Sequence, residues 1–520
     1  MLNITNSVED VKRAGQAHYQ AGRFAEGLAA FELATRLDPA SAASRHNVGL
    51  GLFSLRRCDE SVWHFERALA MEPRLALGWN SLGAALLETG RPGAAVQVLR
   101  RGVELHPGEL GMHSFLICAL ALAGASRAEV LAETAAYAGK FAPVARPAVQ
   151  NGEGRRLRVG FVSGDFRLHA VAWFFEPLLR ELPGAGVEAF CYSHVGRADE
   201  VTGRLRGLAG EGRWREIGAL GDDAAAEVIR GDTLDVVVDL MGHTAGNRLG
   251  IFVRRPVGVQ VSWLGYAGPA PLGVIDARLT DGVMDAGEAA PGDPVVKLET
   301  FAPHGPPGQA VEVWAEGRRE GRVTFACVSN PVKWSEAYLR ACAGILELLP
   351  EARLVMVLPG MDPVAMGRVQ RQFSAGAGGR VEFRGVQPFR DYLLMHQEVD
   401  VVLDTFPVSG HTVTCHALRM GVPVVTRAGA ASWGRLTASV LRGMGKREWI
   451  AETEGEFIEA AVLAGRERAG GAEARERVRA AFLASPAADA AGFSRRFAGA
   501  LRGVVAEVAE RAARVGENVR

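Results

Sequence analysis

Residues 399–426, VDVVLDTFPVSGHTVTCHALRMGVPVVT, carry the strongest single indication of the fold. The segment begins with an apolar run that ends at Asp404, which predicts a buried strand. A Ser-Gly turn follows, and the next residues predict a helix that begins at His411 and Thr412. A Gly-Val-Pro turn then leads into a second apolar run. Strand, turn, helix and strand in this order are one βαβ unit of a parallel sheet.

The turn before this predicted helix is suited to binding phosphate. Gly410 allows the backbone to approach a ligand closely, and a helix beginning at His411 and Thr412 offers N–H groups and a partial positive charge. His416 shares a helix face with Thr412, so we expect its side chain to point the same way. The segment therefore predicts a diphosphate site, with an ordinary βαβ turn that binds nothing as the alternative.

Residues 321–357 repeat this order of elements. An apolar strand leads into a loop with Asn330, Pro331 and Lys333, and an amphipathic helix and another strand follow. A lysine at a strand end, beside helix N-termini, is suited to neutralise the β-phosphate of a departing nucleoside diphosphate. The alternative for Lys333 is an ordinary solvated loop residue.

An earlier α/β region has the same organisation. LRVGFVSGDF at residues 157–166 predicts a strand and a loop, and His169 follows in that loop. TLDVVVDLMGHTAGNR at residues 233–248 predicts a second strand, with His243 just beyond it. Ligands of such sheets bind outside the carboxyl ends of the strands, so both histidines are candidate site residues. The chain is therefore expected to contain two Rossmann-like domains.

The first part of the chain is repetitive. Pro39, Pro73 and Pro107 close similar phrases at intervals of 34 residues, which is the tetratricopeptide period. A glycine precedes each proline by 24 residues, and a large apolar residue follows each glycine in the same register: Gly15, Gly49 and Gly83, then Phe31, Phe65 and Leu99. Three repeats and a degenerate fourth at residues 110–141 predict an α-helical solenoid whose concave surface binds a protein or peptide.

Composition limits the other possibilities. The chain has 520 residues, 48% hydrophobic and 23% charged, with 59 basic and 59 acidic residues, so nucleic acid is not an expected partner. Six scattered cysteines argue against a disulfide scaffold and a zinc site. The first residues lack a secretion-signal pattern, and the longest apolar run, near residues 116–125, is about half of a membrane span. We therefore expect a cytoplasmic protein without a membrane span.

Four motifs in this order resemble the protein O-GlcNAc transferases and their SPINDLY-like relatives. They are SGDF at residues 163–166, WLGYAGPAP at 263–271, NPVK at 330–333 and SGHT at 409–412. Members of this family join tetratricopeptide repeats to a GT-B glycosyltransferase with two Rossmann-like domains. The resemblance implies the same fold class here.

The implied domain layout has five parts. These are tetratricopeptide repeats at 1–141, a linker at 142–156, an N-terminal catalytic lobe at 157–305, a C-terminal nucleotide-sugar-binding lobe at 306–490, and a closing helix and tail at 491–520. We expect the last helix to cross back to the first lobe.

The resemblance also implies site residues. It assigns catalytic roles to His169, Lys333 and His243. It assigns nucleotide-sugar contacts to Asn330, Lys333, Gln387, Tyr392, Gly410, His411, Thr412 and His416. Two positions depart from the family pattern: Val413 stands where the family has a second threonine, and His416 replaces an acidic residue that commonly binds ribose.

The implied reaction is the inverting transfer of GlcNAc from UDP-GlcNAc to a Ser or Thr hydroxyl of a protein bound along the repeats. The resemblance implies neither a metal nor a cofactor, and the donor region has no DxD motif. Three alternatives stay open: another donor such as GDP-fucose or a UDP-hexose, another acceptor such as flagellin or an Asn side chain, and a repeat adaptor whose transferase lobe is inactive.

Overall fold

The computed structural model describes residues 7–149, 154–271, 273–286, 293–305, 322–467 and 471–518. Part of the predicted linker, 150–153, and the start of the predicted C-terminal lobe, 306–321, lie outside these ranges. The contacts group the chain into two compact units, Met1–Gly124 with Arg322–Tyr392, and Ala125–Gly321 with Leu393–Arg520. The domain limits inferred from the sequence stay a prediction.

The repeats are helical, as predicted. The first unit holds α1 (Val8–Gln20), α2 (Phe24–Leu37), α3 (Ala42–Ser54), α4 (Cys58–Met71), α5 (Ala76–Glu88), α6 (Pro92–Leu105) and α7 (Leu110–Leu122), and the second begins with α8 (Arg127–Ala138). Consecutive helices from α1 to α7 pack on one another. The helices α2, α4 and α6 each end just before the repeated proline, because proline cannot continue a helix.

The repeated glycines allow the close approach of paired helices. A Cβ atom added at Gly49 would lie 2.5 Å from the ring of Phe65, and one added at Gly15 would lie 2.7 Å from Phe31. At Gly83 the distance to Leu99 would be 2.7 Å. The large residue predicted in each second helix therefore fills the space that each glycine leaves.

Gly49→Ala is expected to lower the free energy of unfolding by about 1–3 kcal/mol, because the added methyl would overlap a fully buried ring. Gly111→Ala in α7 is the matched control, since nothing lies within 4 Å of an added Cβ there. It should change the free energy of unfolding by less than about 1 kcal/mol, because Gly111 is the second residue of α7 rather than one of its middle residues. Urea unfolding measures both changes, and equal effects would contradict this packing.

The first unit also contains three parallel strands in the order β10-β9-β8. They are β8 (Thr324–Cys327), β9 (Arg353–Val357) and β10 (Val381–Arg384), accompanied by α13 (Glu336–Leu348), α14 (Pro363–Gln370), α15 (Ala375–Gly378), α16 (Phe389–Met395) and the short turns η2 (Pro331–Lys333) and η3 (Pro359–Met361). Arg368 on α14 donates to both carboxylate oxygens of Asp59 on α4 at 2.7 Å. The repeats are thus attached to this half-sheet.

The second unit holds a seven-stranded parallel sheet in the order β3-β2-β1-β4-β5-β6-β7. Its strands are β1 (Leu157–Ser163), β2 (Val187–Ser193), β3 (Trp214–Glu216), β4 (Val236–Asp239), β5 (Gln260–Ser262), β6 (Ala277–Asp281) and β7 (Val295–Leu298). Its helices are α9 (Ala172–Glu181), η1 (Leu182–Ala185), α10 (Glu200–Ala209), α11 (Asp222–Gly231) and α12 (Leu249–Val253). The apolar strands are buried, as a sheet covered on both faces requires.

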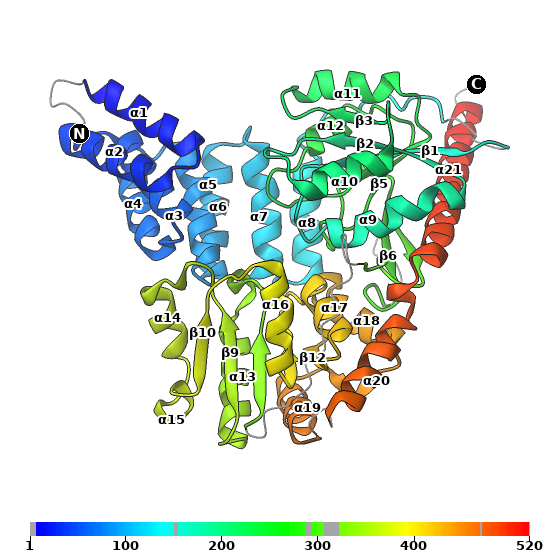
Figure 1. The fold of residues 1–520 in the computed structure, drawn as a ribbon. Helices are drawn as coiled ribbons and strands as arrows, with labels where there is room; N and C mark the ends of the chain where they lie inside the picture. Colours follow the sequence, from blue (N-terminus) through cyan, green and yellow to red (C-terminus); the bar gives the residue numbers. More distant parts are fainter. Residues whose placement is uncertain are drawn as a thin grey trace. The chain divides into compact units, whose positions relative to one another are not determined.

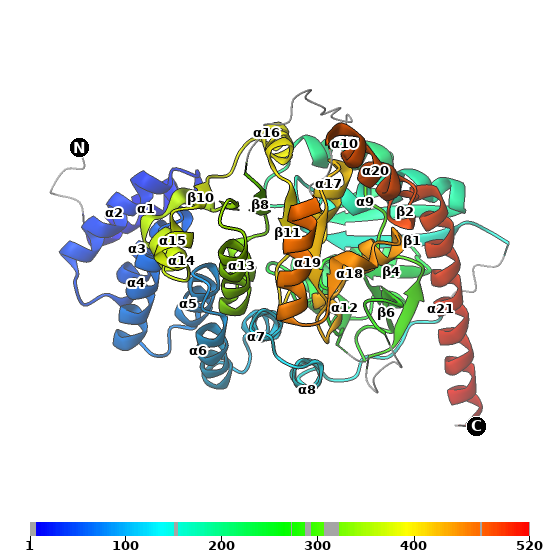
Figure 2. The same ribbon diagram turned by 90° about the horizontal axis from the view of Figure 1, so that it is seen from below.

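The second unit also contains parallel strands in the order β11-β12-β13, namely β11 (Val401–Leu403), β12 (Val424–Arg427) and β13 (Ile450–Ala451). The helical elements are η4 (His396–Glu398), α17 (Thr412–Arg419), η5 (Ser432–Gly434), α18 (Leu436–Gly443), η6 (Arg447–Trp449), α19 (Glu454–Glu467), α20 (Gly471–Leu483), η7 (Pro486–Ala488) and α21 (Ala490–Asn518). Figure 2 shows α19 beside β11, and both α18 and α19 contact β12.

The long last helix α21 packs on α9 and η1 of the first sheet, as predicted (Figure 1). The short strand β13 was not predicted from the sequence. A strand of two residues is too short to show a period, so its pairing with β12 is not visible in the sequence.

The predicted fold class, a tetratricopeptide solenoid followed by two Rossmann-like α/β domains, is confirmed. No helix in the described ranges is long and apolar enough to cross a membrane.

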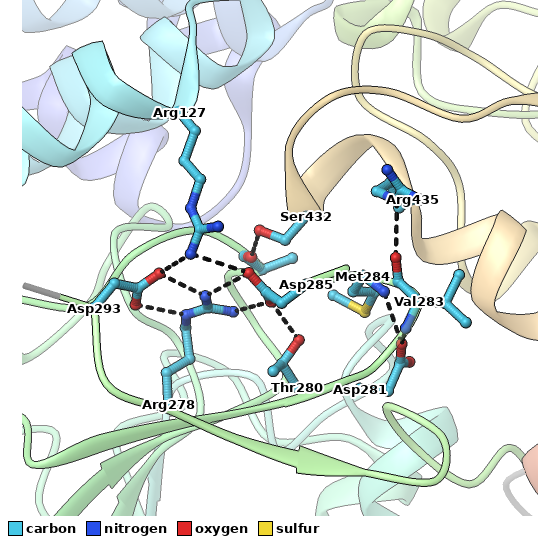
Figure 3. A network of polar contacts seen from close by, with 11 residues as sticks. Arg127, Arg278, Thr280, Asp281, Val283, Met284, Asp285, Asp293, Ser432 and Arg435 are labelled. Atoms are coloured by element: carbon cyan, nitrogen blue, oxygen red, sulfur yellow. Dashed lines mark hydrogen bonds and ion pairs between the residues drawn. The ribbon is translucent and has the colours of Figure 1, made fainter. Parts of the chain in front are cut away.

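A buried ion network ties α8 to the first sheet (Figure 3). The guanidinium of Arg278 on β6 lies 3.1 Å from Asp285 and 2.8 Å from Asp293. Arg127 at the start of α8 reaches the same two carboxylates, at 3.3 and 2.9 Å. Thr280 donates to Asp285 at 2.6 Å. The two acidic side chains are therefore neutralised and hydrogen-bonded inside the protein.

Candidate active site

The turn after β11 is held by one buried carboxylate. Asp404 is 1% exposed and accepts hydrogen bonds from the backbone N–H of Gly410, at 2.6 Å, and from the hydroxyl of Thr426, at 2.7 Å. A Cβ atom at Gly410 would lie 2.8 Å from that carboxylate. The turn therefore requires glycine at this position, and the close approach of Gly410 to a ligand stays a prediction.

The turn leads directly into α17, whose N-cap residue is His411. Its side chain makes no capping hydrogen bond within the described part of the chain. The imidazole instead stacks on Phe174 of α9, with ring centroids 4.1 Å apart and planes 5° apart. The backbone N–H groups of the first turn of a helix attract anions, so this end of α17 suits a phosphate.

The start of α18 forms hydrogen bonds to the same turn. The hydroxyl of Ser409 accepts from the backbone of Leu436 at 3.0 Å, and Thr437 donates to the carbonyl of Gly410 at 3.0 Å. Thr414 and Thr437 share a further hydrogen bond of 2.7 Å. These contacts fix the position of Gly410, so the backbone of this turn is preorganised.

His169 lies just before α9, and its carbonyl accepts from the backbone of Ala172 at 3.0 Å. Its Nδ1 atom lies 3.4 Å from the carboxylate of Asp165, and its side chain is 39% exposed. Burial lowers the pKa of His169 below its usual range, although Asp165 opposes the shift. The imidazole is therefore neutral at pH 7 and able to accept a proton.

His243 is the second histidine predicted to be catalytic. It is 1% exposed and lies edge-to-face between Tyr137 of α8 and Tyr266, with ring centroids at 5.2 and 5.4 Å. Nearby, Asp239 at the end of β4 accepts from the N–H groups of residues 241 and 242, and burial raises its pKa to about 6. The surroundings of His243 suit ring packing, and its catalytic role stays a prediction.

His416 lies on the second turn of α17, as predicted, and is 6% exposed. Its ring meets Trp173 edge-to-face at 4.5 Å and lies 5.3 Å from the ring of His304. Burial lowers the pKa of His416 to about 3, and the charges of His396 and Arg419 act in the same direction. His416 is thus a neutral hydrogen-bonding group at pH 7.

The other predicted contacts lie in the first unit. Lys333 ends the short turn η2, which contacts α5 and immediately precedes α13. Asn330 caps that turn by accepting from the backbone N–H of Val332 at 3.1 Å. Burial raises the pKa of the Cys118 thiol in α7 to about 11, and the positive charge of Lys333 opposes this shift. The lysine therefore lies at a strand end beside a helix N-terminus, as predicted.

The two residues predicted to meet the base also lie in this unit. Gln387 is exposed in the loop between β10 and α16. Tyr392 lies on α16, with its ring 6.0 Å from that of Phe389, and burial raises its pKa. The binding roles of these residues stay predictions.

Within the second unit the start of α9 contacts the start of α17, because Phe174 of α9 stacks on His411. Sequence reasoning missed three residues of this region: Phe174, Thr437 and His304. All three residues lie in segments to which the sequence motifs assign no role.

Comparison with known proteins identifies the family. The model of glycosyl transferase family 41 matches residues 125–291 and 320–496. A probable UDP-N-acetylglucosamine–peptide N-acetylglucosaminyltransferase SPINDLY of Solanum lycopersicum is 32% identical over 66% of this chain. The probable enzyme SEC of Arabidopsis thaliana is 26% identical over 55% of the chain. The chain spans only 38% of the tomato protein and 30% of the Arabidopsis protein.

A solved structure agrees over nearly the whole chain. A mutant O-GlcNAc transferase of Thermobaculum terrenum is 30% identical, superposes with a TM-score of 0.87, and matches over 97% of this chain and 98% of its own. Since the family model covers more than half of the sequence and includes strands of both sheets, the chain belongs to glycosyl transferase family 41 and is a glycosyltransferase.

Proposed function

We propose that this glycosyltransferase transfers GlcNAc from UDP-GlcNAc, with inversion, to a Ser or Thr hydroxyl of a protein bound along the repeats. The observation that carries the proposal is the Asp404-held turn at Gly410, which leads into the N-terminus of α17. The names of the relatives favour UDP-GlcNAc as donor and a peptide as acceptor. The helical repeats supply a surface of the kind that binds extended peptides.

In this proposal the acceptor oxygen forms a bond to the anomeric carbon while the bond from that carbon to the β-phosphate oxygen breaks. The departing diphosphate gains negative charge, which the N-terminus of α17 and the ammonium of Lys333 stabilise. The acceptor hydroxyl loses its proton during this step. His169, neutral at pH 7, is the group that we assign to orient this hydroxyl or accept that proton.

Lys333→Ala is expected to lower turnover about 10²–10³-fold, because it removes a charge that stabilises the leaving diphosphate. Thermal unfolding of wild type should shift upward with UDP and UDP-GlcNAc, because a ligand of the native state stabilises it. The shift should be smaller in Lys333→Ala. Lys12→Ala is the control, since Lys12 pairs with Glu9 on the first repeat helix and should affect neither measurement.

Each other outcome has a distinct meaning. Stabilisation by GDP and GDP-fucose, but not by UDP, would mean that the donor is a GDP-sugar and that it binds at the proposed site. If nucleotides stabilise wild type and Lys333→Ala equally, Lys333 does not contact the bound nucleotide. A response to no nucleotide would overturn the proposal and favour an adaptor with an inactive transferase lobe.

A further inference from the structure

A short segment around the start of α18 forms a group of hydrogen bonds whose role the proposed reaction leaves open. This bridging segment, residues 432–439, contains η5 and the first turn of α18. Most of its side chains are buried, and Ser432 and Trp433 are each 4% exposed. Its polar groups bond to two parts of the second unit: the ends of β5 and β6 with their loops, and the turn that contains Gly410. The segment therefore links the first sheet to the turn before α17.

Three side chains of the bridging segment donate hydrogen bonds to the carboxyl ends of strands in the first sheet. The bonds run from Ser432 to the carbonyl of Ala267 at 2.5 Å, from Arg435 to the carbonyl of Val283 at 2.8 Å, and from Ser439 to the carboxylate of Asp281 at 2.5 Å. Figure 3 shows the bond from Arg435 to Val283. Because β1, β4, β5 and β6 are parallel neighbours, these contacts lie at the sheet edge where β1 ends before His169.

The loop after β5 is packed closely against the neighbouring strand end. Leu264 has a φ of 78°, a left-handed conformation that costs free energy for residues other than glycine. A Cβ atom added at Gly265 would lie 2.1 Å from the carbonyl of Leu240, just beyond β4. Such a conformation persists only where surrounding contacts hold it, and the bond from Ser432 to Ala267 is one of these contacts.

Other groups of the same segment hold the turn before α17. The carbonyl of Trp433 accepts from the backbone N–H of Ser409 at 3.0 Å, and Thr437 donates to the carbonyl of Gly410 at 3.0 Å. Ser432 and Thr437 therefore act on different partners. Removing the hydroxyl of Ser432 loosens the loop after β5, whereas removing that of Thr437 loosens the turn at Gly410.

We propose that the bridging segment sets the distance between the turn at Gly410 and the carboxyl edge of the first sheet, and that Ser432 and Ser439 are positioning residues for glycosyl transfer. This inference rests on the proposed function, which assigns the leaving diphosphate to that turn and the acceptor hydroxyl to His169. The new bond to the anomeric carbon forms only when both sides are correctly placed, and a misplacement of about 1 Å can lower the rate about 100-fold.

The test compares wild type with Ser432→Ala and Ser439→Ala in two assays. Calorimetry measures the Kd for UDP, and transfer from UDP-GlcNAc is measured with a peptide that wild type modifies, chosen from an array of synthetic Ser and Thr peptides. GDP and GDP-fucose replace these probes if GDP is the nucleotide that stabilises wild type. Both variants should lower kcat about 10–100-fold. Their Kd for the nucleotide should stay within about twofold of wild type, because the bonds from Trp433 and Thr437 to the turn remain.

Two controls separate position from stability. Ser485→Ala is matched to Ser432→Ala, since Ser485 is also 4% exposed and its hydroxyl donates to a carbonyl, that of Phe482 in α20, at 2.6 Å. It should lower the unfolding temperature by a similar amount and leave kcat unchanged. Thr437→Val keeps the shape of the side chain and removes its bond to Gly410, so it should weaken nucleotide binding about two- to tenfold.

Four results would overturn the inference. A wild-type kcat in both serine variants would make their hydrogen bonds purely structural and leave the proposed function intact. An equal loss of kcat in Ser485→Ala would assign the loss to stability. A rise in the Kd for the nucleotide as large as the fall in kcat would place the effect of Ser432→Ala at the nucleotide. Wild type that binds no nucleotide or modifies no peptide would remove the proposed function itself, and with it this inference.

Discussion

Arg278→Met is expected to lower the free energy of unfolding by about 3–5 kcal/mol, because it leaves two carboxylates buried without their principal cation. Arg278 is 2% exposed, and its partners Asp285 and Asp293 are 5% and 1% exposed. Methionine has a similar volume, so the change in charge outweighs the change in packing. Urea unfolding at pH 7 measures the loss.

Arg511→Met is the matched control for this prediction. Arg511 pairs with Glu507 on the exposed face of α21, and its side chain is 64% exposed. An exposed pair of this kind contributes about 0–1 kcal/mol. Adding Asp293→Asn to Arg278→Met should recover part of the loss, because Arg127 still pairs with Asp285 at 3.3 Å. Equal effects of Arg278→Met and Arg511→Met would contradict the network.

The features predicted correctly from sequence are those set by local spacing. Gly49 and Phe65 are 16 residues apart, and the repeat period alone places them on paired helices that meet. The turn at Gly410 was predictable for the same reason, since a strand, a glycine and a helix N-terminus follow one another within a few residues.

The features that were missed depend on contacts between distant segments. His304 and His416 are 112 residues apart, and no periodicity connects a loop after β7 to a helix after β11. Phe174 belongs to an apolar helix face, so its stacking on His411 is indistinguishable in sequence from ordinary core packing. Tertiary packing decides which side chain of a buried face meets the site, and a single sequence does not encode that choice locally.

The buried network shows the same limit for charged residues. In the strand of Arg278 the sequence alternates apolar and polar residues, a pattern that by itself does not indicate a buried arginine. The structure buries it instead, because Asp285, Asp293 and Arg127 converge there from two loops and the start of α8. Only the folded chain brings these compensating charges together, so the exposure of Arg278 was not predictable from its own strand.

Acidification from pH 7 to pH 4 is expected to destabilise the chain through histidines whose pKa values are lowered in the fold, among them His416 and His194. Burial lowers the pKa of His416 to about 3 and that of His194 to about 4, against an ordinary value of 6.5. Below pH 6.5 the unfolded chain binds protons that the folded chain excludes, so stability falls with falling pH by up to about 1.4 kcal/mol per unit for each group. Asp239 acts oppositely: its pKa is raised to about 6, so the folded chain takes up that proton first.

Because these contributions oppose one another, the wild-type curve alone does not isolate His416, and a difference between two curves does. His416→Asn removes one titrating group and keeps a polar side chain of similar reach. The difference in unfolding free energy between wild type and this variant should change by roughly 3 kcal/mol between pH 7 and pH 4, with wild type losing more. Urea unfolding at half-unit steps of pH measures it. Parallel curves would mean that His416 takes up its proton in the folded chain, and the neutral imidazole required beside α17 would then be absent at acidic pH.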